Sequence, residues 1–370
     1  MYVVKDGKTL RRGYSTGSCA AAAARAAVTL LFGGERMSAV SIDTPAGVRL
    51  QLPVEQIQQA RDRVACGVRK DSGDDPDVTG GALIVAEARK SDLPGIRVTA
   101  GEGVGRVTRP GLPVPPGQPA INPVPLAMIH KEVEEVLPPG EGVRVEICIP
   151  GGKELAAKTF NARLGIEGGL SILGTTGLVE PMSDHAFRET LALEIRQVVA
   201  EVGHAGLVLV PGNHGKNVAC RELSLAEKRV IRMGNEVGFA LDRCLENSVQ
   251  QVLLVGHLGK LVKVAAGIFQ THSRVADGRF EVTAAHAVLG GAPVETVQAL
   301  SRCRTVEAML EVLDRAVTPR FYRRLARTIS RRSREHVHDV FPVGTVLFSL
   351  QRGILGMDRP AKKMLEALRC

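Results

Sequence analysis

The spacing of apolar residues changes near residue 190, and this change predicts two domains of different architecture. The first half is rich in Gly and Pro and contains short apolar runs, of which Val143–Ile149 alternates most clearly. Strands are expected at Tyr2–Val4, Ala39–Ile42, Val48–Leu52, Ile84–Ala88, Ile96–Ala100 and Val143–Ile149, and helices at Ser18–Leu31 and Asn122–Val136. Clustered strands with few helices favour an α+β domain over residues 1–190.

The second half alternates between strands, glycine-rich loops and helices. Strands are expected at Leu207–Val210, Arg229–Met233, Gln251–Val255 and Thr345–Leu350, and helices at Phe187–Val202, at Glu236–Glu246 and from the 256–260 loop to Phe269. Such alternation is typical of parallel strands joined by helices. We therefore predict a parallel α/β sheet with flanking helices over residues 191–370, with a mainly helical part beyond Glu281.

The composition limits the kinds of partner that the protein is expected to bind. The 370 residues carry a formal net charge of +9, and only 3% are aromatic, with no Trp. So few aromatic residues argue against a protein that stacks single-stranded nucleic acid on aromatic rings. The segment Arg320–Glu335 holds seven Arg and one Glu. A basic helix of this kind binds nucleic acid, a membrane surface or an acidic small molecule in some proteins, and is a solvated helix face in many others.

The cysteines and the apolar runs indicate a cytoplasmic protein. None of the seven Cys lies in a CxxC pair, which predicts free thiols and no cysteine-based zinc site. No apolar run reaches the length of about 18 residues that a membrane span needs. Arg11 and Arg12 precede the apolar segment Cys19–Phe32 as in a twin-arginine export signal, but Arg25 interrupts the segment and no small-x-small cleavage site follows.

Two segments of the first half could hold charged ligands. The Gly-rich turn Gly13–Cys19 opens an Ala-rich helix, whose free N–H groups would attract an anion. The same pattern is typical of a capped, buried helix, and it also resembles the phosphate loop of small-molecule kinases. The segment Arg69–Thr79 holds four carboxylates within seven residues, which suits a cation or a cationic ligand but is equally typical of a solvated turn.

Two further loops carry weaker signals. Glycines at 101, 103 and 105 follow an expected strand, as in a Rossmann nucleotide site. A proline-rich stretch follows instead of the required helix, which excludes that site. The loop Ser171–Gly177 is rich in small hydroxyl residues, a composition that is more often structural than functional.

Two GxxGK loops, 212–216 and 256–260, each follow an expected strand of the second half. A P-loop is excluded, because such a loop has four residues between its glycines and Ser or Thr after the Lys. Loops at the carboxyl ends of parallel strands lie at one edge of a sheet, so the two could form one crevice. His214, His257 and His272 are expected near that edge as ligands or acid/base groups, although each alone is typical of a structural histidine.

Seven segments stand in this order along the chain: GYSTGSCAAAAARAA, VRKDSGDDPDVTGG, GEGVGRVTRPGL, PAINPVPLAMI, GGLSILGTTGLVEPMS, LVPGNHGK and LLVGHLGKLVKVAAGIFQTHSRVADGR. As a set they closely resemble the CbiD family of cobalt-precorrin-5B C1-methyltransferases, from about Arg11 to Arg279. The resemblance implies methylation of carbon C1 of a cobalt-containing tetrapyrrole by S-adenosylmethionine, in the anaerobic cobalamin pathway. It also implies an N-terminal α+β domain similar to ribosomal protein S5 domain 2 and a C-terminal parallel α/β domain. Cobalt would lie only within the substrate, and no metal ligand of the protein is expected.

The resemblance and the loops together suggest roles for named residues. The glycine-rich crevice is expected to hold S-adenosylmethionine or one edge of the macrocycle, through Gly212, Asn213, Gly215, Gly256, His257, Gly259 and Lys260. Hydroxyl and backbone groups for the substrate carboxylates are expected at Ser15, Thr16, Gly17, Ser18, Thr175 and Thr176. Proton handling, or contact with the donor's amino-acid part, is expected from Asp74, Asp75, Glu102 and His272.

Two alternative functions stay open at this point. A small-molecule kinase would use the Gly13–Cys19 loop for phosphate and would bind ATP and magnesium. A nucleic-acid-binding protein would use the helix Arg320–Arg334, with binding that weakens steeply with salt. The methyltransferase interpretation expects neither nucleic acid nor membrane as a partner, and it leaves the oligomeric state open, a homodimer included.

Overall fold

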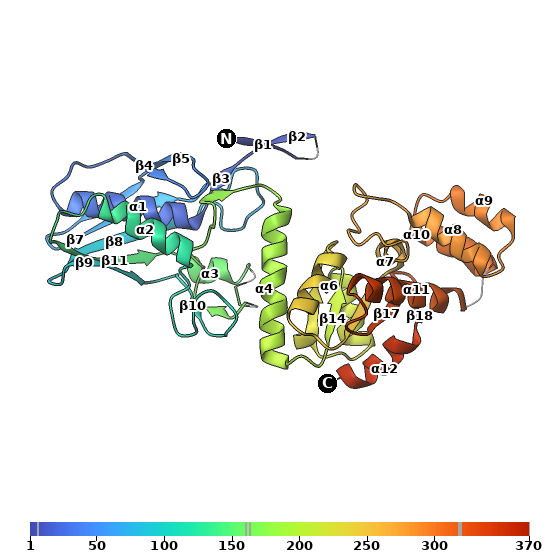
Figure 1. Ribbon diagram of the computed structural model, residues 1–370. Coiled ribbons are helices and arrows are strands. Elements are labelled where there is room, and N and C mark those ends of the chain that lie inside the picture. The colour runs from blue at the N-terminus through green and yellow to red at the C-terminus, as the bar shows by residue number, and fades with distance from the viewer. Residues whose placement is uncertain (6, 160, 163, 317–319, 370) are drawn as a thin grey trace. The chain divides into compact units, whose positions relative to one another are not determined.

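The computed structural model describes residues 1–5, 7–159, 161–162, 164–316 and 320–369. The chain divides into two compact units, Met1–Asp184 and His185–Cys370, here called the N-terminal unit and the C-terminal unit. The predicted boundary at residue 190 lies within the helix that begins the second unit, α4 (Asp184–Val202). Both units combine helices with sheets (Figure 1).

The N-terminal unit is built on a five-stranded mixed sheet. Its strands, in spatial order, are β6 (Gln56–Gln59), β7 (Arg63–Arg69), β8 (Leu83–Lys90), β11 (Gly142–Cys148) and β9 (Gly95–Ala100). β9 pairs with β11 in parallel, and the other neighbours are antiparallel. The helices α1 (Thr16–Leu31) and α2 (Pro123–Glu134) lie side by side against this sheet (Figure 1).

The alanines of α1 explain how closely these layers approach. Ala20 to Ala24 are all 0% exposed, because α1 packs against α2 on one side and against β7 and β8 on the other. Small side chains let the helix backbones and the sheet come near one another without voids. The guanidinium of Arg25 joins the two helices, with Nη1 2.6 Å from the Glu132 carboxylate and 2.5 Å from that of Glu135.

Short elements surround this core. They are β1 (Tyr2–Lys5) with β2 (Lys8–Arg11), β4 (Ala39–Asp43) with β5 (Arg49–Pro53), β3 (Gly13–Tyr14) with β13 (Leu178–Val179), β10 (Arg106–Val107) with β12 (Ile166–Glu167), and the helix α3 (Gly152–Ala156). Each of these strand pairs is antiparallel.

The glycine-rich loop 101–105 serves backbone packing. Gly103 has φ +75°, and a Cβ there would lie 1.9 Å from the carbonyl oxygen of Ile149. The backbone of Gly103 in turn lies 2.3 Å or less from the Cβ positions of Gly152 and Gly169. The glycines of this loop therefore let three backbone segments meet, which agrees with the exclusion of a Rossmann site.

The C-terminal unit contains a five-stranded sheet in the order β15 (Val230–Arg232), β14 (Leu207–Val210), β16 (Val252–His257), β17 (Val343–Ser349) and β18 (Gly353–Met357). The first four strands are parallel, and only β18 is antiparallel to its neighbour. The helices are α5 (Asn213–Asn217), α6 (Val237–Glu246), α7 (Leu258–Val264), α8 (Arg279–Leu289), α9 (Val294–Ser301), α10 (Val306–Ala316), α11 (Arg320–His336) and α12 (Arg359–Leu368). A π-helical turn (Val218–Glu222) and a 3₁₀ turn (Glu227–Arg229) follow α5.

Alternating residues of the buried strands serve two cores. Leu207 and Leu209 belong to the core formed with α4, α6 and α11, whereas Val208 and Val210 belong to the core formed with the π-helical turn and α12. The sheet is therefore covered on both faces, as its continuous apolar strands require.

Some element predictions were incomplete. The helix after the 256–260 loop ends at Val264 rather than at Phe269, and Gly267 beyond it adopts φ +81°. The strands β2, β6, β7 and β18 were missed, as were the two-residue strands β3, β10, β12 and β13. No helix in the described part of the chain is long and apolar enough to cross a membrane.

Candidate functional sites

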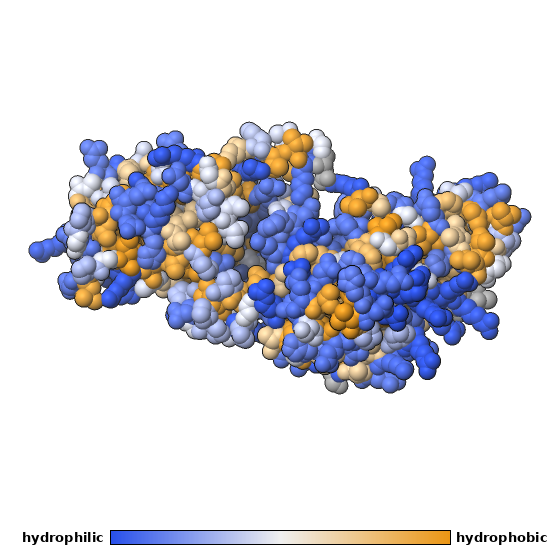
Figure 2. All heavy atoms as spheres, in the orientation of Figure 1, coloured by the Kyte–Doolittle hydropathy of each residue, from blue (hydrophilic) through white to orange (hydrophobic). Residues whose placement is uncertain are grey.

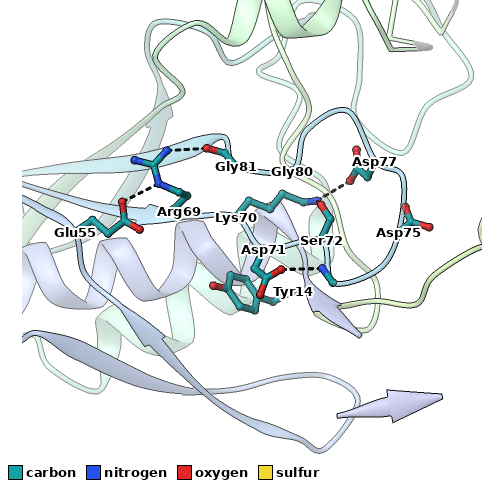
Figure 3. Close-up of a pocket in the computed structure, with 11 residues that line it drawn as sticks. Tyr14, Glu55, Arg69, Lys70, Asp71, Ser72, Asp75, Asp77, Gly80 and Gly81 are labelled. Carbon is teal, nitrogen blue, oxygen red and sulfur yellow. Dashed lines mark hydrogen bonds and ion pairs between the residues drawn. The ribbon is translucent and has the colours of Figure 1, made fainter. Parts of the chain in front are cut away.

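A polar cavity of about 400 Å³ lies in the N-terminal unit (Figure 3). Most of its wall comes from the loop that leaves β7, and Tyr14 and Glu55 complete it. The lining residues are Tyr14, Glu55, Arg69, Lys70, Asp71, Ser72, Gly73, Asp75, Asp77, Gly80 and Gly81. The Asp-rich segment of the sequence is thus one wall of a cavity as well as a turn.

Lys70 is the buried centre of this wall. Its side chain is 3% exposed, and its ammonium donates to Ser72 Oγ at 2.7 Å and to Asp77 Oδ2 at 2.6 Å, as Figure 3 shows. Burial alone would raise the pKa of Asp77. Hydrogen bonds from Lys70 and Thr79, together with the charge of Lys70, outweigh burial and lower that pKa. The carboxyl of Asp77 is therefore ionised at neutral pH, and its bond to Lys70 fixes the loop.

A second ion pair anchors the same loop to the end of β2. The guanidinium of Arg11 donates to both carboxylate oxygens of Asp71, at 2.5 and 2.8 Å, and these bonds lower the pKa of Asp71. Burial raises the pKa of the neighbouring Tyr14 to about 12, so its hydroxyl stays protonated at neutral pH. The cavity accordingly offers carboxylates, a guanidinium and a phenol within one wall.

The predicted acid/base residues of this unit have different surroundings. Asp74 is exposed, and its Oδ2 accepts from the backbone N–H of Arg11 at 2.6 Å. Asp75 lines the cavity, and its Oδ1 accepts from the backbone N–H of Met182 at 2.8 Å. Glu102 is exposed on the 101–105 loop, and its backbone carbonyl accepts from the N–H of Ile149. Of these three residues, Asp75 is the one that lines the cavity.

Groups of the chain itself occupy the hydrogen-bonding positions at the start of α1. The loop 171–177 lies against it: the N–H of Ser15 donates to Gly177 O and that of Gly17 to Leu173 O, both at 3.0 Å. The hydroxyl of Ser18 donates to Gly177 O at 2.6 Å, and Thr16 Oγ1 accepts from the N–H of Leu173 at 2.9 Å.

The hydroxyl residues near α1 therefore differ in access. Ser15, Thr16 and Ser18 are at most 3% exposed, and Ser15 Oγ caps the helix by accepting from the N–H of Ser18. This is the capped, buried helix that the sequence allowed as an alternative. Thr175 and Thr176, on the packed loop, are exposed and remain accessible to a ligand.

The two GxxGK loops of the C-terminal unit follow neighbouring parallel strands. β14 and β16 pair in parallel, with Leu209 opposite Leu254, so both loops leave the same edge of the sheet. The chain goes from β14 to β15 on one side and then to β16 on the other, which makes the gap after β14 and β16 a topological switch point. Crevices for ligands in doubly wound sheets form at such points.

Several glycines of these loops are explained by packing. A Cβ on Gly215 would lie 2.9 Å from the Val210 side chain, and one on Gly256 would lie 2.7 Å from Leu261. A Cβ on Gly259 would lie 3.0 Å from Val306. Gly212, by contrast, adopts an extended φ of 173° and has open space around its Cβ position.

His257 is held in one tautomer between two partners. Its Nδ1 accepts from the N–H of Gly259 at 3.1 Å and caps α7. Its Nε2 therefore carries the proton and donates to Glu307 Oε1 at 3.1 Å. The other oxygen of Glu307 is buried and has no hydrogen-bond partner among the described residues. Glu307, which lies far from His257 in the sequence, is thus part of the switch-point edge.

The two lysines of the GxxGK loops differ in their partners. Lys216 forms an ion pair with Glu227. Lys260 is half-buried, and within the described residues no hydrogen bond or ion pair engages its ammonium. Burial, and then the charge of Lys263, lower the pKa of Lys260. A bound anion beside Lys260 would stabilise its charged ammonium and so offset both effects. This ammonium is therefore the group at this edge that is best placed to contact an anion.

The remaining predicted residues of this unit are less confined. Asn213 and His214 are exposed, and Asn213 Oδ1 accepts from Arg232 at 2.7 Å. His272 is half-buried, and its Nδ1 accepts from the backbone N–H of Arg274 at 3.2 Å. Among the described residues, no group of three or more His, Cys, Asp or Glu side chains could hold a metal ion.

The sequence interpretation did not select four of the residues described above. Lys70 and Asp77 lie in the quoted Asp-rich segment, but sequence spacing does not show that they pair. Tyr14 sits in the quoted Gly-rich turn, and Glu307 follows no motif at all.

Comparison with known proteins gives a consistent result. A family model described as CbiD matches residues 3–181, and one described as CbiD, C-terminal domain, matches residues 270–359. A relative from Thermoanaerobacter sp. (strain X514), named cobalt-precorrin-5B C(1)-methyltransferase, is 48% identical over 96% of this chain and 97% of its own. A relative of the same name from Moorella thermoacetica is also 48% identical, with the same coverage.

A solved structure extends the comparison. The crystal structure of a cobalamin biosynthesis protein (cbiD) from Archaeoglobus fulgidus is 29% identical and covers 75% of this chain and 87% of that chain, with a TM-score of 0.39. Since nearly half of all positions are identical to full-length relatives that carry one name, and both family models match, the chain belongs to the CbiD family.

Proposed function

We propose that this chain transfers a methyl group from S-adenosylmethionine to ring carbon C1 of cobalt-precorrin-5B, giving cobalt-precorrin-6A in the anaerobic cobalamin pathway. The observation that carries this proposal is the 48% identity to the Thermoanaerobacter methyltransferase over 96% of this chain. This similarity covers both units, so it bears on the activity of the whole protein and not on one unit alone. The cobalt ion belongs to the substrate, whose macrocycle holds it.

The task of the protein in such a reaction is mainly to position the reactants. When bound, S-adenosylmethionine supplies the electrophilic methyl group. Transfer to carbon needs a near-linear approach of the two reacting centres, and fixed geometry supplies a large part of the rate enhancement. The macrocycle is electron-rich, so the reaction does not depend on a strong protein base.

The donor site is proposed at the switch-point edge of the C-terminal unit. The half-buried ammonium of Lys260 would accept the carboxylate of the donor's amino-acid part. His257 and Glu307 fix the turn that carries Lys260, and the open space at Gly212 leaves room for a ligand near the neighbouring loop. Asn213, Gly215, Gly256 and Gly259 would shape the same edge.

The roles proposed for residues of the N-terminal unit depend on how exposed their side chains are. Thr175 and Thr176 are the accessible hydroxyl residues beside α1, so they are proposed as partners of substrate carboxylates ahead of the buried Ser15, Thr16 and Ser18. Asp75 is proposed for proton handling, because it lines the polar cavity. Asp74, Glu102 and His272 are weaker candidates for that role, since they do not line this cavity.

The fold of each unit is also part of the proposal. We assign residues 1–190 to a domain similar to ribosomal protein S5 domain 2, supported by two helices against one mixed sheet. Residues 191–370 are assigned to a parallel α/β domain, supported by the four parallel strands of the second sheet.

The direct test is incubation with cobalt-precorrin-5B and S-adenosylmethionine carrying a ¹³C-labelled methyl group. One labelled methyl group is expected per macrocycle, bonded to C1 in the NMR spectrum of the product. Label at another ring position, or none, would contradict the proposed function. ATP with magnesium serves as the control for the kinase alternative and is expected to show no turnover.

Lys260→Ala is expected to weaken the binding of S-adenosylmethionine by about 10-fold or more, since a charge-assisted hydrogen bond contributes about 1.5–3 kcal/mol. The matched control is Lys216→Ala in the other GxxGK loop. Its ammonium is already paired with Glu227, so a smaller loss is expected. Isothermal titration calorimetry gives both affinities. Equal affinities for the parent protein and Lys260→Ala would remove this lysine from the donor site.

A further inference from the structure

A second cavity, a groove of about 850 Å³, lies along α11 in the C-terminal unit. Seven guanidinium groups line it, six from α11 and one from the start of α12. The lining residues are Arg320, Arg323, Arg324, Arg327, Ser330, Arg331, Arg334, Val343, Asp358, Arg359 and Pro360. The surface over α11 is mostly hydrophilic (Figure 2). The groove lies where β17 begins, at the edge of the sheet opposite the GxxGK loops.

The arginines occupy one face of α11 at considerable electrostatic cost. Their spacing of three or four residues places each guanidinium beside the next along the helix, while Phe321, Leu325 and Ile329 are buried on the other side. Like charges at this spacing destabilise a helix, and a cation in the first turn also opposes the helix dipole. The first turn of α11 contains no acidic residue. Folding alone gives no reason for such a row.

Few acidic residues neutralise the charges of these arginines. Arg331 pairs with Glu335, and Arg334 pairs with Asp339. In the described part of the chain, no hydrogen bond or ion pair engages the guanidinium groups of Arg320, Arg323, Arg327 and Arg359. The charge is therefore left for a ligand along the N-terminal half of the groove.

One buried carboxylate also lines the groove. Asp358 is 2% exposed, and its Oδ1 caps α12 by accepting from the N–H of Ala361 at 2.9 Å and also accepts from that of Thr345 at 3.2 Å. Its Oδ2 is buried and has no hydrogen-bond partner among the described residues. One oxygen of a buried carboxylate is thus left without a hydrogen bond from the described residues at the wall of the groove.

We infer that the α11 groove is a capture site for a tetrapyrrole fringed with carboxylates, separate from the proposed donor site. Guanidinium groups bind carboxylates through two parallel hydrogen bonds and also stack on flat conjugated rings. Pro360 adds apolar surface for the ring. A cluster of one sign of charge in a concave site raises the rate at which a polyanion is captured. The inference rests on the proposed function for the identity of the ligand.

The shape of the groove favours a small polyanion over nucleic acid. Its volume lies within the range of about 300–1,000 Å³ that is typical of small-molecule sites. The described lining contains no aromatic residue on which bases could stack.

The test uses uroporphyrin I, which carries eight carboxylates, as the probe, and measures its binding by absorbance titration. Arg323→Gln with Arg327→Gln in one chain is expected to weaken binding by about 10-fold or more. The matched control is Arg332→Gln, on the same helix but outside the groove and paired with Glu335, which is expected to bind like the parent. Removing two like charges is expected to leave the melting temperature equal or higher, so unfolding would not explain the loss.

Asp358→Asn gives a change of opposite sign. Asn caps α12 as well as Asp does, and the substitution removes the carboxylate that lines the groove, so tighter binding of uroporphyrin is expected. Equal binding by the parent and the double Arg variant, no binding by the parent, or weaker binding by Asp358→Asn would overturn the inference. Preference for a DNA duplex over uroporphyrin in 150 mM salt would overturn it as well.

The methyl-transfer assay separates this inference from the proposed function. With cobalt-precorrin-5B, the double Arg variant is expected to lower kcat/KM about 10-fold with kcat unchanged, and to depend less on ionic strength. If the parent binds uroporphyrin through the groove but does not methylate, the proposed function fails and the groove assignment stands. If the parent methylates and the double variant binds uroporphyrin equally, only the groove assignment fails.

Discussion

Replacing Gly103 by Ala is expected to destabilise the N-terminal unit by about 2–5 kcal/mol, from a left-handed backbone and an overpacked contact together. The residue has φ +75°, which costs an L side chain about 1–2 kcal/mol. The new Cβ would also lie 1.9 Å from the carbonyl oxygen of Ile149, a backbone atom that cannot rotate away. Hydrogen exchange measured by mass spectrometry reports the loss separately for each unit, and the C-terminal unit is expected to keep its protection.

Gly151→Ala is the matched control for this substitution. Gly151 also has a left-handed φ, +71°, but nothing lies within 4 Å of its Cβ position. Its replacement is expected to cost only the conformational part, about 1–2 kcal/mol. Similar protection of β7 and β8 in the two variants would show that the contact between Gly103 and Ile149 is not tight, and that the 101–105 glycines have another role.

The elements that the sequence predicted best have a periodic pattern of their own. Val143–Ile149 alternates and became β11, and Ser18–Leu31 is almost entirely helix-forming and became α1. The strand β7 was missed although Val64, Cys66 and Val68 alternate, because Arg and Gly at the other positions obscured the pattern. A periodic pattern of apolar residues was therefore enough to predict a helix or strand. The prediction failed where residues of other kinds obscured the pattern.

The glycine motifs could not be interpreted from sequence alone. Glycine is required wherever a ligand approaches the backbone and equally wherever another backbone segment does. At Gly103 and Gly215 the structure shows protein atoms in that position. The same limit applies to Ser18, whose hydroxyl donates to Gly177 O about 160 residues away, and to Ser15, whose hydroxyl caps α1 by accepting from the N–H of Ser18.

Contacts between distant residues account for the other omissions. The partner of His257 is Glu307, and the groove of α11 is completed by Asp358 and Arg359. None of these contacts has a sequence signal, because each brings together residues that are far apart along the chain. The seven arginines were visible in the sequence, but that six of them line a cavity was not.

Lys70→Met is expected to destabilise the N-terminal unit by about 3 kcal/mol at neutral pH, because it leaves the carboxylate of Asp77 without its partner in a largely buried site. The matched control is Arg69→Met at the next position. Arg69 pairs with Glu55 at the surface, where both side chains are more than a third exposed, so a loss below about 1 kcal/mol is expected. Urea unfolding followed by circular dichroism measures both changes, since the chain contains no Trp.

The pH dependence of Lys70→Met tests the cause of the loss. The pKa of Asp77 is lower in the folded protein than in the unfolded chain, so its stabilisation is complete above the unfolded pKa of about 4 and is lost as the pH falls through the folded pKa. The difference between parent and variant should therefore shrink below about pH 4. Adding Asp77→Asn should recover at least about 1 kcal/mol of the loss, as expected for residues in direct contact. A loss that is independent of pH and fully additive with Asp77→Asn would mean that Lys70 stabilises the loop by packing and not through its ion pair.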